Sequence, residues 1–313
     1  MISTFRIEDH RFVEVTGADP RNLGEAVWVD LLAPSASEQG VVIERFGEVL
    51  PRGADPGEIE ATSRYVENQD AIQVQLNFLD HSVQPIRNMN VAFAWRGGPL
   101  LSLHDEDLKA AQMFRSRAGH QPELAGDGMA VFLGILESKV DHLADVLEDT
   151  YGRLEQLTRR VLDQTEADLQ SDLVALAEVE DQNGKIRLNL MDTQRVLTSL
   201  RRSDKLDEGK QRLDEVLRDV DSLLSHTAFL LEQISFLSDT TIGLINIEQN
   251  QIVKVLSVVA AVFLPPTLIA SLYGMNFRHM PELSWAIGYP MAIALMIILG
   301  ATPYLYAKQR GWM

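Results

Sequence analysis

Two long uncharged segments lie close together near the C-terminal end of the sequence. No Asp, Glu, Lys or Arg occurs in the 23 residues 255–277, nor in the 25 residues 283–307. About 20 apolar residues are enough for an α-helix to cross the hydrocarbon core of a bilayer. Two such runs favour a membrane-spanning hairpin over the alternative, a helical hairpin buried in a soluble protein. We expect a first span at about 252–273, an outer loop at 274–284 and a second span at about 285–307.

The charge of the chain divides at the same place. The segment from Ile252 onward has a formal charge of +3, whereas all 313 residues together carry −17, so residues 1–251 carry −20. Lys254 precedes the first run, and Lys308 and Arg310 follow the second. Because Lys and Arg are enriched on the cytoplasmic flanks of spans, both termini are expected in the cytoplasm. The N-terminal residues contain no apolar signal segment, which agrees with this orientation.

Several classes of protein are disfavoured by composition and motifs. So acidic a chain lacks the basic face that nucleic-acid phosphates require, so no nucleic-acid partner is expected. The absence of cysteine excludes disulfides and thiolate metal sites. No phosphate-binding loop, HExxH or GxSxG motif occurs, so we expect neither an enzyme nor an organic cofactor. The acidic run that begins at His104 resembles a set of metal ligands, but we expect a helix N-terminus capped by His104 or Asp105.

The first part of the chain mixes short strand-like runs with turns. Alternation of apolar residues predicts strands at 26–32 and 71–79, and a β-hairpin is predicted from 91–95 and 100–103. Helices are expected at 37–49 and 56–64. These patterns predict an α+β cytoplasmic domain, a small sheet with helices, in residues 1–120.

The pattern becomes helical after this domain. Apolar residues recur every three or four positions in 131–162, in 168–200 and again from Gln211 onward. No proline occurs between Gln211 and Pro265, so the third helix is expected to run unbroken into the first span. We therefore divide the rest of the chain into a cytoplasmic helical bundle with long stalk helices, residues 121–250, and a two-helix transmembrane hairpin with a basic cytoplasmic tail, residues 251–313.

A motif marks the outer end of the hairpin. The first run ends in Tyr273-Gly274-Met275-Asn276, and Met280-Pro281-Glu282-Leu283 follows in the loop. The chain resembles the CorA family of magnesium transporters, whose signature is Gly-Met-Asn at the outer end of the first transmembrane helix. The segment 245–277, the ending PYLYAKQRGWM and the cytoplasmic runs ESKVDHLADVLE and RLNLMDTQRVL resemble the family as well. The resemblance covers essentially the whole chain.

The resemblance implies an assembly and a substrate. It implies a CorA-like homopentamer in the bacterial inner membrane, in which the first spans line a pore and the second spans form an outer ring. The partners are then other copies of the chain, the lipid bilayer and hydrated divalent cations. Mg²⁺ is implied as both the transported and the regulatory ion, with influx down the electrochemical gradient, and Co²⁺ and Ni²⁺ as further substrates.

The Gly-Met-Asn motif also has a physical interpretation as a selectivity filter. Mg²⁺ holds water at about 2.0–2.1 Å and releases it reluctantly. A filter can therefore offer oxygen atoms that accept hydrogen bonds from the coordinated water. The amide oxygen of Asn276 and the carbonyl oxygens of Gly274 and Met275 are candidates. The simpler alternative is that Asn276 caps the end of the helix.

A stripe of residues at helical spacing continues inward from the motif. Steps of three and four residues predict that this pore stripe consists of Asn250, Val253, Leu256, Ala260, Leu264, Thr267 and Ser271. The spacing does not choose between Leu256 and Ser257. The apolar middle of the stripe suggests a gate that closes by dewetting; the alternative is that it only packs against neighbouring helices. Pro265 and Pro266 are expected to bend this helix, with Thr267 helping to satisfy the backbone groups that they free.

The family resemblance further implies regulation by cytoplasmic Mg²⁺ bound between subunits by acidic residues. Glu58, Asp219 and Asp221 are the candidate ligands in this sequence. Three alternatives remain open: a zinc transporter of the same superfamily, a membrane-anchored metal-dependent enzyme and a non-conducting scaffold.

Overall fold

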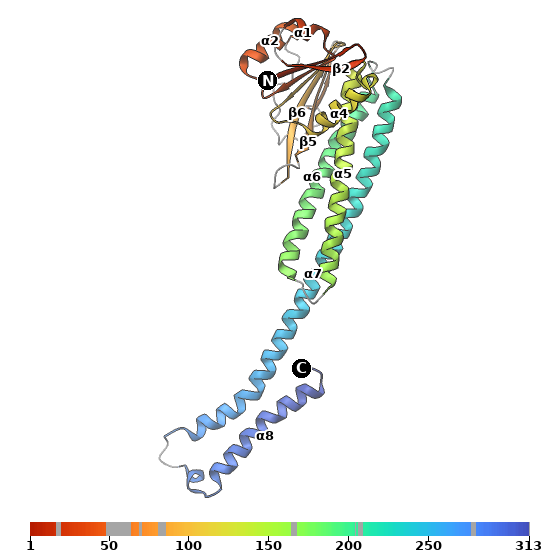
Figure 1. The fold of residues 1–313 in the computed structure, drawn as a ribbon. Helices are drawn as coiled ribbons and strands as arrows, with labels where there is room; N and C mark the ends of the chain where they lie inside the picture. The colour runs from red at the N-terminus through yellow and green to blue at the C-terminus, as the bar shows by residue number, and fades with distance from the viewer. Residues whose placement is uncertain are drawn as a thin grey trace. The chain divides into compact units, whose positions relative to one another are not determined.

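The computed structural model describes residues 1–16, 20–47, 64–68, 71–80, 86–163, 168–203, 205, 209–276 and 280–312. These residues form two compact units, 1–237 and 238–313. The first unit contains a sheet and several helices, and the second contains the end of a long helix followed by a second apolar helix (Figure 1). The helix predicted at 56–64 falls almost entirely outside the described residues.

A seven-stranded sheet lies in the first unit. Its order is β2-β1-β3-β7-β6-β5-β4, and all neighbouring strands are antiparallel except β3 and β7, which are parallel. The strands are β1 (Ile2–Glu8), β2 (Arg11–Thr16), β3 (Trp28–Leu32), β4 (Tyr65–Glu67), β5 (Ile72–Asp80), β6 (Arg87–Trp95) and β7 (Leu100–His104). The predictions of β3, β5 and the β6–β7 hairpin are confirmed.

The β1–β2 hairpin was not predicted from the sequence. Its loop consists of Asp9 and His10, which have φ angles of 46° and 59°. A two-residue loop with positive φ at both positions matches the right-handed twist of the flanking strands. The usual sequence signal for this loop is Asn-Gly or Asp-Gly, and neither pair is present here.

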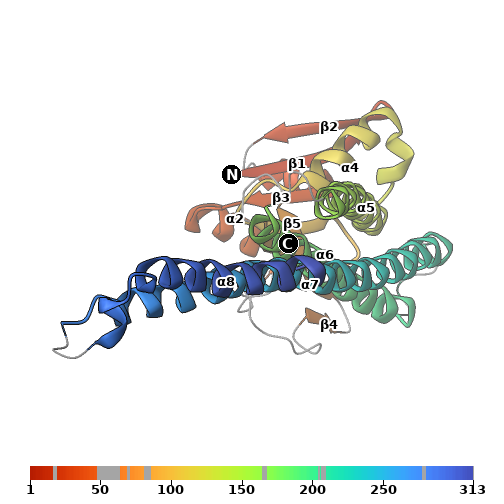
Figure 2. The same ribbon diagram turned by 90° about the horizontal axis from the view of Figure 1, so that it is seen from below.

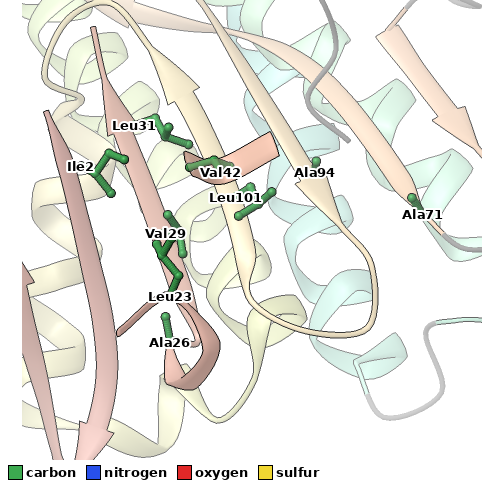
Figure 3. Packing of buried hydrophobic residues seen from close by; sticks show 9 residues of the cluster. All are labelled: Ile2, Leu23, Ala26, Val29, Leu31, Val42, Ala71, Ala94 and Leu101. Atoms are coloured by element: carbon green, nitrogen blue, oxygen red, sulfur yellow. The ribbon is translucent and has the colours of Figure 1, made fainter. Parts of the chain in front are cut away.

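Helices cover both faces of the sheet. One face packs under α1 (Pro20–Glu25) and α2 (Ala36–Phe46), which corresponds to the helix predicted at 37–49. The core cluster on this face consists of Ile2, Leu23, Ala26, Val29, Leu31, Val42, Ala71, Ala94 and Leu101 (Figure 3). On the other face, the Phe5 ring stacks on Trp28 with centroids 4.4 Å apart, and Trp28 meets Phe114 at 6.0 Å. Val29 and Leu31 of β3 thus face one side of the sheet and Trp28 the other, because successive side chains of a strand point to opposite faces.

Along the described chain, the sheet is followed by α4 (Lys109–His120), α5 (Gly128–Leu162), α6 (Leu169–Arg201) and α7 (Lys210–Tyr273), and then by the last helix of the second unit. Asp127 and Asp168 cap α5 and α6 by accepting hydrogen bonds from the backbone N–H groups three residues ahead, at 2.7 and 3.3 Å. The helices predicted at 131–162 and 168–200 are confirmed, and α5 and α6 run side by side (Figure 1). The third helix, α7, is continuous for 64 residues, as expected.

A buried lysine lies where the helices meet the sheet. Lys139 of α5 is 1% exposed, and its Nζ donates a hydrogen bond to Thr193 Oγ1 at 2.8 Å and lies 4.7 Å from the ring centroid of Phe78. On α6, Asp192 pairs with Arg64. Burial lowers the pKa of Lys139 to about 7, the charge of Asp192 opposes this shift, and the charge of Arg64 adds to it. These contacts fix α5 and α6 against β5.

The prediction that His104 or Asp105 caps a helix is wrong. His104 is the last residue of β7, and α4 begins at Lys109 after Leu108, whose side chain makes no capping hydrogen bond. The Nε2 atom of His104 lies 2.8 Å from Oδ1 of Asp30, a residue 74 positions away in the chain. A long-range contact therefore holds His104 in the strand, and local cap statistics do not include it.

His104 and Asp30 form a buried ion pair. Both ring nitrogens face oxygen atoms, since Nδ1 lies 2.6 Å from the carbonyl oxygen of Glu106, and this favours the imidazolium form. Burial by itself lowers the pKa of His104, but the hydrogen bond and charge of Asp30 outweigh it and raise the pKa above its usual value. Asp30 also accepts a hydrogen bond from Ser102, which in turn accepts one from Trp28 Nε1 at 2.8 Å. One carboxylate thus joins the parallel strands β3 and β7.

Replacing Asp30 with Asn should destabilise the protein in a pH-dependent manner. Removing one partner of a buried ion pair is expected to cost about 3 kcal/mol of unfolding free energy near pH 6. Because the folded-state pKa of His104 is raised, the stabilisation is complete below the unfolded pKa of His104 and is lost as pH rises through the folded value. The destabilisation by Asp30→Asn should therefore be smaller at pH 9 than at pH 6 in thermal unfolding of the full chain in detergent.

The matched control is Glu14→Gln, which removes an exposed carboxylate from β2. It should change the unfolding free energy by less than about 0.5 kcal/mol at both pH values. An effect of Asp30→Asn that is equal at pH 6 and pH 9 would contradict the ion pair.

Candidate functional site

The second unit is an apolar helical hairpin. It contains the C-terminal part of α7 and the helix α8 (Gly288–Gln309). The most apolar 18-residue windows of these helices have mean hydropathies of 2.2 and 1.6, yet only 11% and 17% of their residues are buried inside the chain. A core helix of a soluble protein would be mostly buried. The exposed apolar surface therefore requires a cover from outside the chain, as a bilayer provides.

The two helices of the hairpin approach each other closely at Gly300. A Cβ atom placed on Gly300 would lie 3.3 Å from the Val262 carbonyl oxygen and 3.3 Å from Cγ of Pro266. Small residues at the contact are typical of helix packing in membranes, where they let the backbones come together. Val258 and Ile269 of α7 are buried in the same hairpin, in which the helices lie side by side (Figure 2). The role of Gly300 has no signal in the sequence, because an isolated glycine in an apolar run forms no pattern.

The predicted pore stripe lies on the other side of α7. All seven of its residues are exposed, for example Val253 at 59% and Leu264 at 67%. At about 100° per residue, the stripe is centred about 180° around the helix from Val258 and Ile269. Both Leu256 and Ser257 are exposed, and they lie at similar angles on either side of the centre, so the choice between them stays open.

The two prolines do not interrupt the assigned helix, which continues through Pro265 and Pro266 to Tyr273. They lack the N–H groups that would bond to the carbonyl oxygens four residues earlier, on Ala261 and Val262. The expectation that Thr267 satisfies these groups is wrong, because its hydroxyl donates to the carbonyl oxygen of Phe263 at 2.7 Å. The Val262 carbonyl instead faces Gly300 of α8. The close contact between α7 and α8 thus lies where α7 lacks a backbone hydrogen bond.

The Gly-Met-Asn motif begins directly after α7. Gly274 N donates to the Ala270 carbonyl at 3.0 Å and Met275 N to the Leu272 carbonyl at 3.3 Å, so these two residues continue the last helical turn. Gly274, Met275 and Asn276 are all exposed. A Cβ atom on Gly274 would lie 3.1 Å from the Ala270 carbonyl oxygen, which is a tight contact. Oxygen acceptors therefore collect at the end of α7, at the same end as the polar members Thr267 and Ser271.

The outer turn returns the chain to α8. A 3₁₀ helix, η2 (Pro281–Ser284), contains most of the Met-Pro-Glu-Leu sequence. A Cβ atom on Gly288 would lie only 2.3 Å from the Glu282 carbonyl oxygen, so any larger residue would force this turn to move. Trp285 and Tyr289, on either side of this contact, are 56% and 79% exposed. Large aromatic residues in this position are typical of the interface between lipid and water.

The candidate regulatory residues are not brought together within one chain. Glu58 lies outside the described residues. Asp219 and Asp221 are both exposed on α7, but residues two positions apart in a helix point in different directions. Asp221 Oδ1 accepts a hydrogen bond from Gln194 Nε2 of α6 at 2.6 Å. No group of three or more His, Asp or Glu side chains that could hold a metal ion occurs in the described part of the chain.

These features define a class of protein. A large acidic unit precedes two apolar helices, and one of them presents a polar and apolar stripe that ends in oxygen acceptors, which is the arrangement of a membrane transport protein. A family model described as CorA-like Mg²⁺ transporter protein matches residues 24–309. The chain belongs to this family.

Full-length relatives agree with this assignment. Magnesium transport protein CorA of Salmonella typhimurium and that of Escherichia coli are each 40% identical to the chain over 316 residues, and the alignments cover 100% of both sequences. Among solved structures, the complete CorA magnesium transporter from Methanocaldococcus jannaschii matches with a TM-score of 0.80 at 18% identity, covering 100% of this chain and 99% of that one. The cytoplasmic domain of ZntB from Vibrio parahaemolyticus matches 78% of the chain and 97% of its own length, with a TM-score of 0.55 at 13% identity.

The comparisons confirm several of the predictions. The CorA-like fold class is confirmed, with its α+β domain, long helices and C-terminal apolar hairpin. Membership of a transporter family also bears out the prediction that the chain is a transport protein and not an enzyme.

The contact at Gly300 makes the hairpin sensitive to added volume. Gly300→Leu should lower the unfolding free energy by about 1–3 kcal/mol, because the new side chain collides with the Val262 carbonyl and the Pro266 ring. The control is Ala294→Leu, which adds a similar volume to an exposed position on the other side of α8 and should change the unfolding free energy by less than about 0.5 kcal/mol. Thermal unfolding of both variants in detergent measures the difference. Equal effects would rule out the close contact.

Proposed function

We propose that this protein is a Mg²⁺ channel that conducts inward across the bacterial inner membrane. The exposed stripe on α7, turned away from α8 and ending at Asn276, is the observation that carries the proposal. An exposed row of polar and apolar residues on a membrane helix needs an aqueous cavity or a protein partner. Five copies of α7 around a common axis satisfy that need, with the stripes facing a pore. The 40% identity to relatives named magnesium transport protein CorA supports Mg²⁺ as the substrate. Co²⁺ and Ni²⁺ are the further substrates of this proposal.

The three parts of the chain have distinct roles in this proposal. Residues 1–120 form the cytoplasmic α+β domain, 121–250 the helical bundle and stalk, and 251–313 the transmembrane hairpin with its basic tail. Both termini lie in the cytoplasm, since Lys254, Lys308 and Arg310 belong to the same end of the hairpin and basic residues favour the cytoplasmic side. Residues 1–251 carry a charge of −20, which concentrates cations near the inner mouth of the pore.

The filter consists of Gly274, Met275 and Asn276. A ring of five Asn276 amides offers oxygen atoms to the water molecules around Mg²⁺ without stripping them from the ion. An amide carries no net charge, so the ion is held weakly enough to leave again. Further in, the apolar stretch from Val253 to Leu264 forms a gate that dries when it narrows. A membrane potential supplies about 2.3 kcal/mol per charge per 100 mV, which doubles for a divalent cation and drives influx.

Replacing the filter amide tests the proposal. Asn276→Ala in proteoliposomes with a negative interior potential should reduce Mg²⁺ influx to the level of empty vesicles, because the ring of amide oxygens is lost. Influx is measured with a fluorescent Mg²⁺ indicator inside the vesicles. The control Gln39→Ala removes an exposed amide from α2 and should leave influx unchanged.

Three results would contradict the channel. The first is undiminished influx in Asn276→Ala with the oligomer intact. The second is a wild type that folds and assembles but conducts no Mg²⁺ at low internal Mg²⁺. The third is transport of Zn²⁺ that requires a proton gradient, which would favour the zinc transporter of the same superfamily.

Cytoplasmic Mg²⁺ closes the channel in our proposal by bridging acidic residues of neighbouring subunits. Loss of the bridging cation lets like charges repel, which separates the subunits and opens the pore. Glu58, Asp219 and Asp221 are the proposed ligands. Because Asp219 and Asp221 point in different directions from α7, each would meet a different neighbour.

Neutralising either aspartate should weaken this inhibition. Asp219→Asn or Asp221→Asn should raise the internal Mg²⁺ concentration for half-maximal inhibition severalfold and leave influx at low internal Mg²⁺ unchanged. The measurement is influx into proteoliposomes loaded with increasing Mg²⁺. Glu180→Gln, which neutralises an exposed acid on α6, is the control and should not shift the curve. An unchanged inhibition curve would remove that aspartate from the set of ligands.

A further inference from the structure

The C-terminal end of α8 is closed by a specific backbone motif. Gly311 has a φ of 69°, its N–H donates to the Lys308 carbonyl at 3.2 Å, and the Trp312 N–H donates to the Ala307 carbonyl at 3.0 Å. This pair of hydrogen bonds around a left-handed glycine is the Schellman motif. It turns the chain back, so that Trp312 returns to the last turn of α8 instead of continuing away from it.

The returning chain builds a cluster of cations and aromatic rings. The Trp312 ring meets Tyr306 edge-on, with centroids 6.4 Å apart, and the guanidinium carbon of Arg310 lies 5.7 Å from the Tyr306 ring centroid. Lys308 lies between these residues in the chain, and all four side chains are exposed. We call Tyr306, Lys308, Arg310 and Trp312 the C-terminal cluster. Its cation–π contact restricts the guanidinium, so less conformational freedom is lost when Arg310 binds an anion.

A third cation lies at the same level on the neighbouring helix. The helices of the hairpin are antiparallel, and Gly300 lies against the carbonyl of Val262. Equal numbers of residues, counted from this contact along both helices, lead to Lys308 on α8 and Lys254 on α7. In the sequence, Glu282 is the only acidic side chain from residue 249 to the end, and it lies at the opposite end of the hairpin. From residue 283 to the end, the positive charge of Lys308 and Arg310 is therefore not offset by an acidic side chain, whereas Glu248 lies six residues before Lys254.

The depth of the cluster corresponds to the headgroup layer. The 17 residue steps from Tyr289 to Tyr306 along α8 correspond to a rise of about 25 Å. The hydrocarbon core of a bilayer is about 30 Å thick, and aromatic residues gather at its two boundaries. Tyr289 and Tyr306 mark these boundaries, which places the charged ends of Lys308 and Arg310 among the phosphates.

We propose that the C-terminal cluster, together with Lys254, binds the phosphate of an anionic phospholipid headgroup. The guanidinium of Arg310 matches the geometry of phosphate oxygens, the two ammonium groups add charge, and the indole N–H of Trp312 adds a donor. The cluster is open to the outside and borders an exposed apolar surface at Leu305, which is 55% exposed. In this proposal the acyl chains of the lipid cover that apolar surface. The proposal rests on the orientation given under the proposed function, with these residues at the cytoplasmic leaflet.

The experiment uses the delipidated full-length protein in detergent. Short-chain phosphatidylglycerol and, separately, short-chain phosphatidylcholine are titrated against the protein, and the thermal unfolding midpoint is recorded. The wild type should show a stabilisation by phosphatidylglycerol that saturates and exceeds the effect of phosphatidylcholine. Each cation at an anionic surface contributes a factor of about five in affinity. Lys308→Gln/Arg310→Gln should therefore weaken the apparent affinity for phosphatidylglycerol about 25-fold and leave the response to phosphatidylcholine unchanged.

The control Lys109→Gln/Arg195→Gln removes two exposed cations from the first unit and should behave as the wild type. A third variant, Trp312→Ala, keeps both cations and should still weaken binding, because the indole N–H donor is lost and the Tyr306 ring beneath Arg310 loses its edge-on partner. Equal stabilisation by the two lipids, or equal responses of the double variant and its control, would overturn the proposal.

The source of the phosphate is tested with inorganic phosphate and glycerophosphoglycerol, which have no acyl chains. Neither should stabilise the protein at the concentrations at which phosphatidylglycerol acts. Stabilisation by either compound would assign the cluster to a soluble anion and contradict a lipid site. Mg²⁺ influx is recorded on the same wild-type preparation. A protein that conducts Mg²⁺ but is stabilised equally by the two lipids would refute the lipid site and leave the proposed function intact.

Discussion

The contact of Gly300 with the Val262 carbonyl determines which surface of the membrane hairpin is exposed. It turns one side of α7 toward α8 and leaves the other side free, and the free side carries the stripe from Asn250 to Ser271. The contact lies where Pro266 has removed the hydrogen-bond partner of that carbonyl. A glycine at this position on α8 admits the carbonyl without a collision, so the same residue pair packs the hairpin and sets the rotation of the proposed pore helix.

The first unit depends on buried polar contacts of a different kind. Asp30 binds His104 and Ser102 and so joins β3 to β7, the parallel pair in the middle of the sheet. Lys139 of α5 donates to Thr193 of α6 and lies over the Phe78 ring of β5, and Asp192 of α6 accepts a hydrogen bond from Asn77 of β5. Charged groups in such enclosed places are costly unless they are paired. They make the arrangement of sheet and helices specific, since a shifted helix would leave a buried charge without its partner.

The relation between the two ends of the hairpin follows from helix geometry. Oxygen acceptors and exposed aromatic residues occur at the end with Asn276 and Tyr289, whereas Lys254, Lys308 and Arg310 gather at the other end. The proposed filter and the proposed binding surface for anionic headgroups are thus separated by about the thickness of the hydrocarbon core. Lys254, Lys308 and Arg310 therefore lie about 30 Å from the proposed filter, and their repulsion of a cation there is weakened because Coulomb energy falls with distance.

Sequence alone was sufficient for the apolar spans, the long helices, the central strands and the family. Each of these depends on a local pattern: uncharged length, a period of 3.6 or 2, or a motif at a helix end. The β1–β2 hairpin was not predicted, because its turn uses Asp and His at positive φ. The structural role of His104 was predicted wrongly, because its partner is 74 residues away in the chain. Only the tertiary structure decided which side of α7 faces α8, that Thr267 bonds to Phe263, and that Trp312 folds back onto Tyr306. These features depend on contacts between particular side chains and on individual backbone angles. The periodic pattern of apolar residues in the sequence contains no information on either.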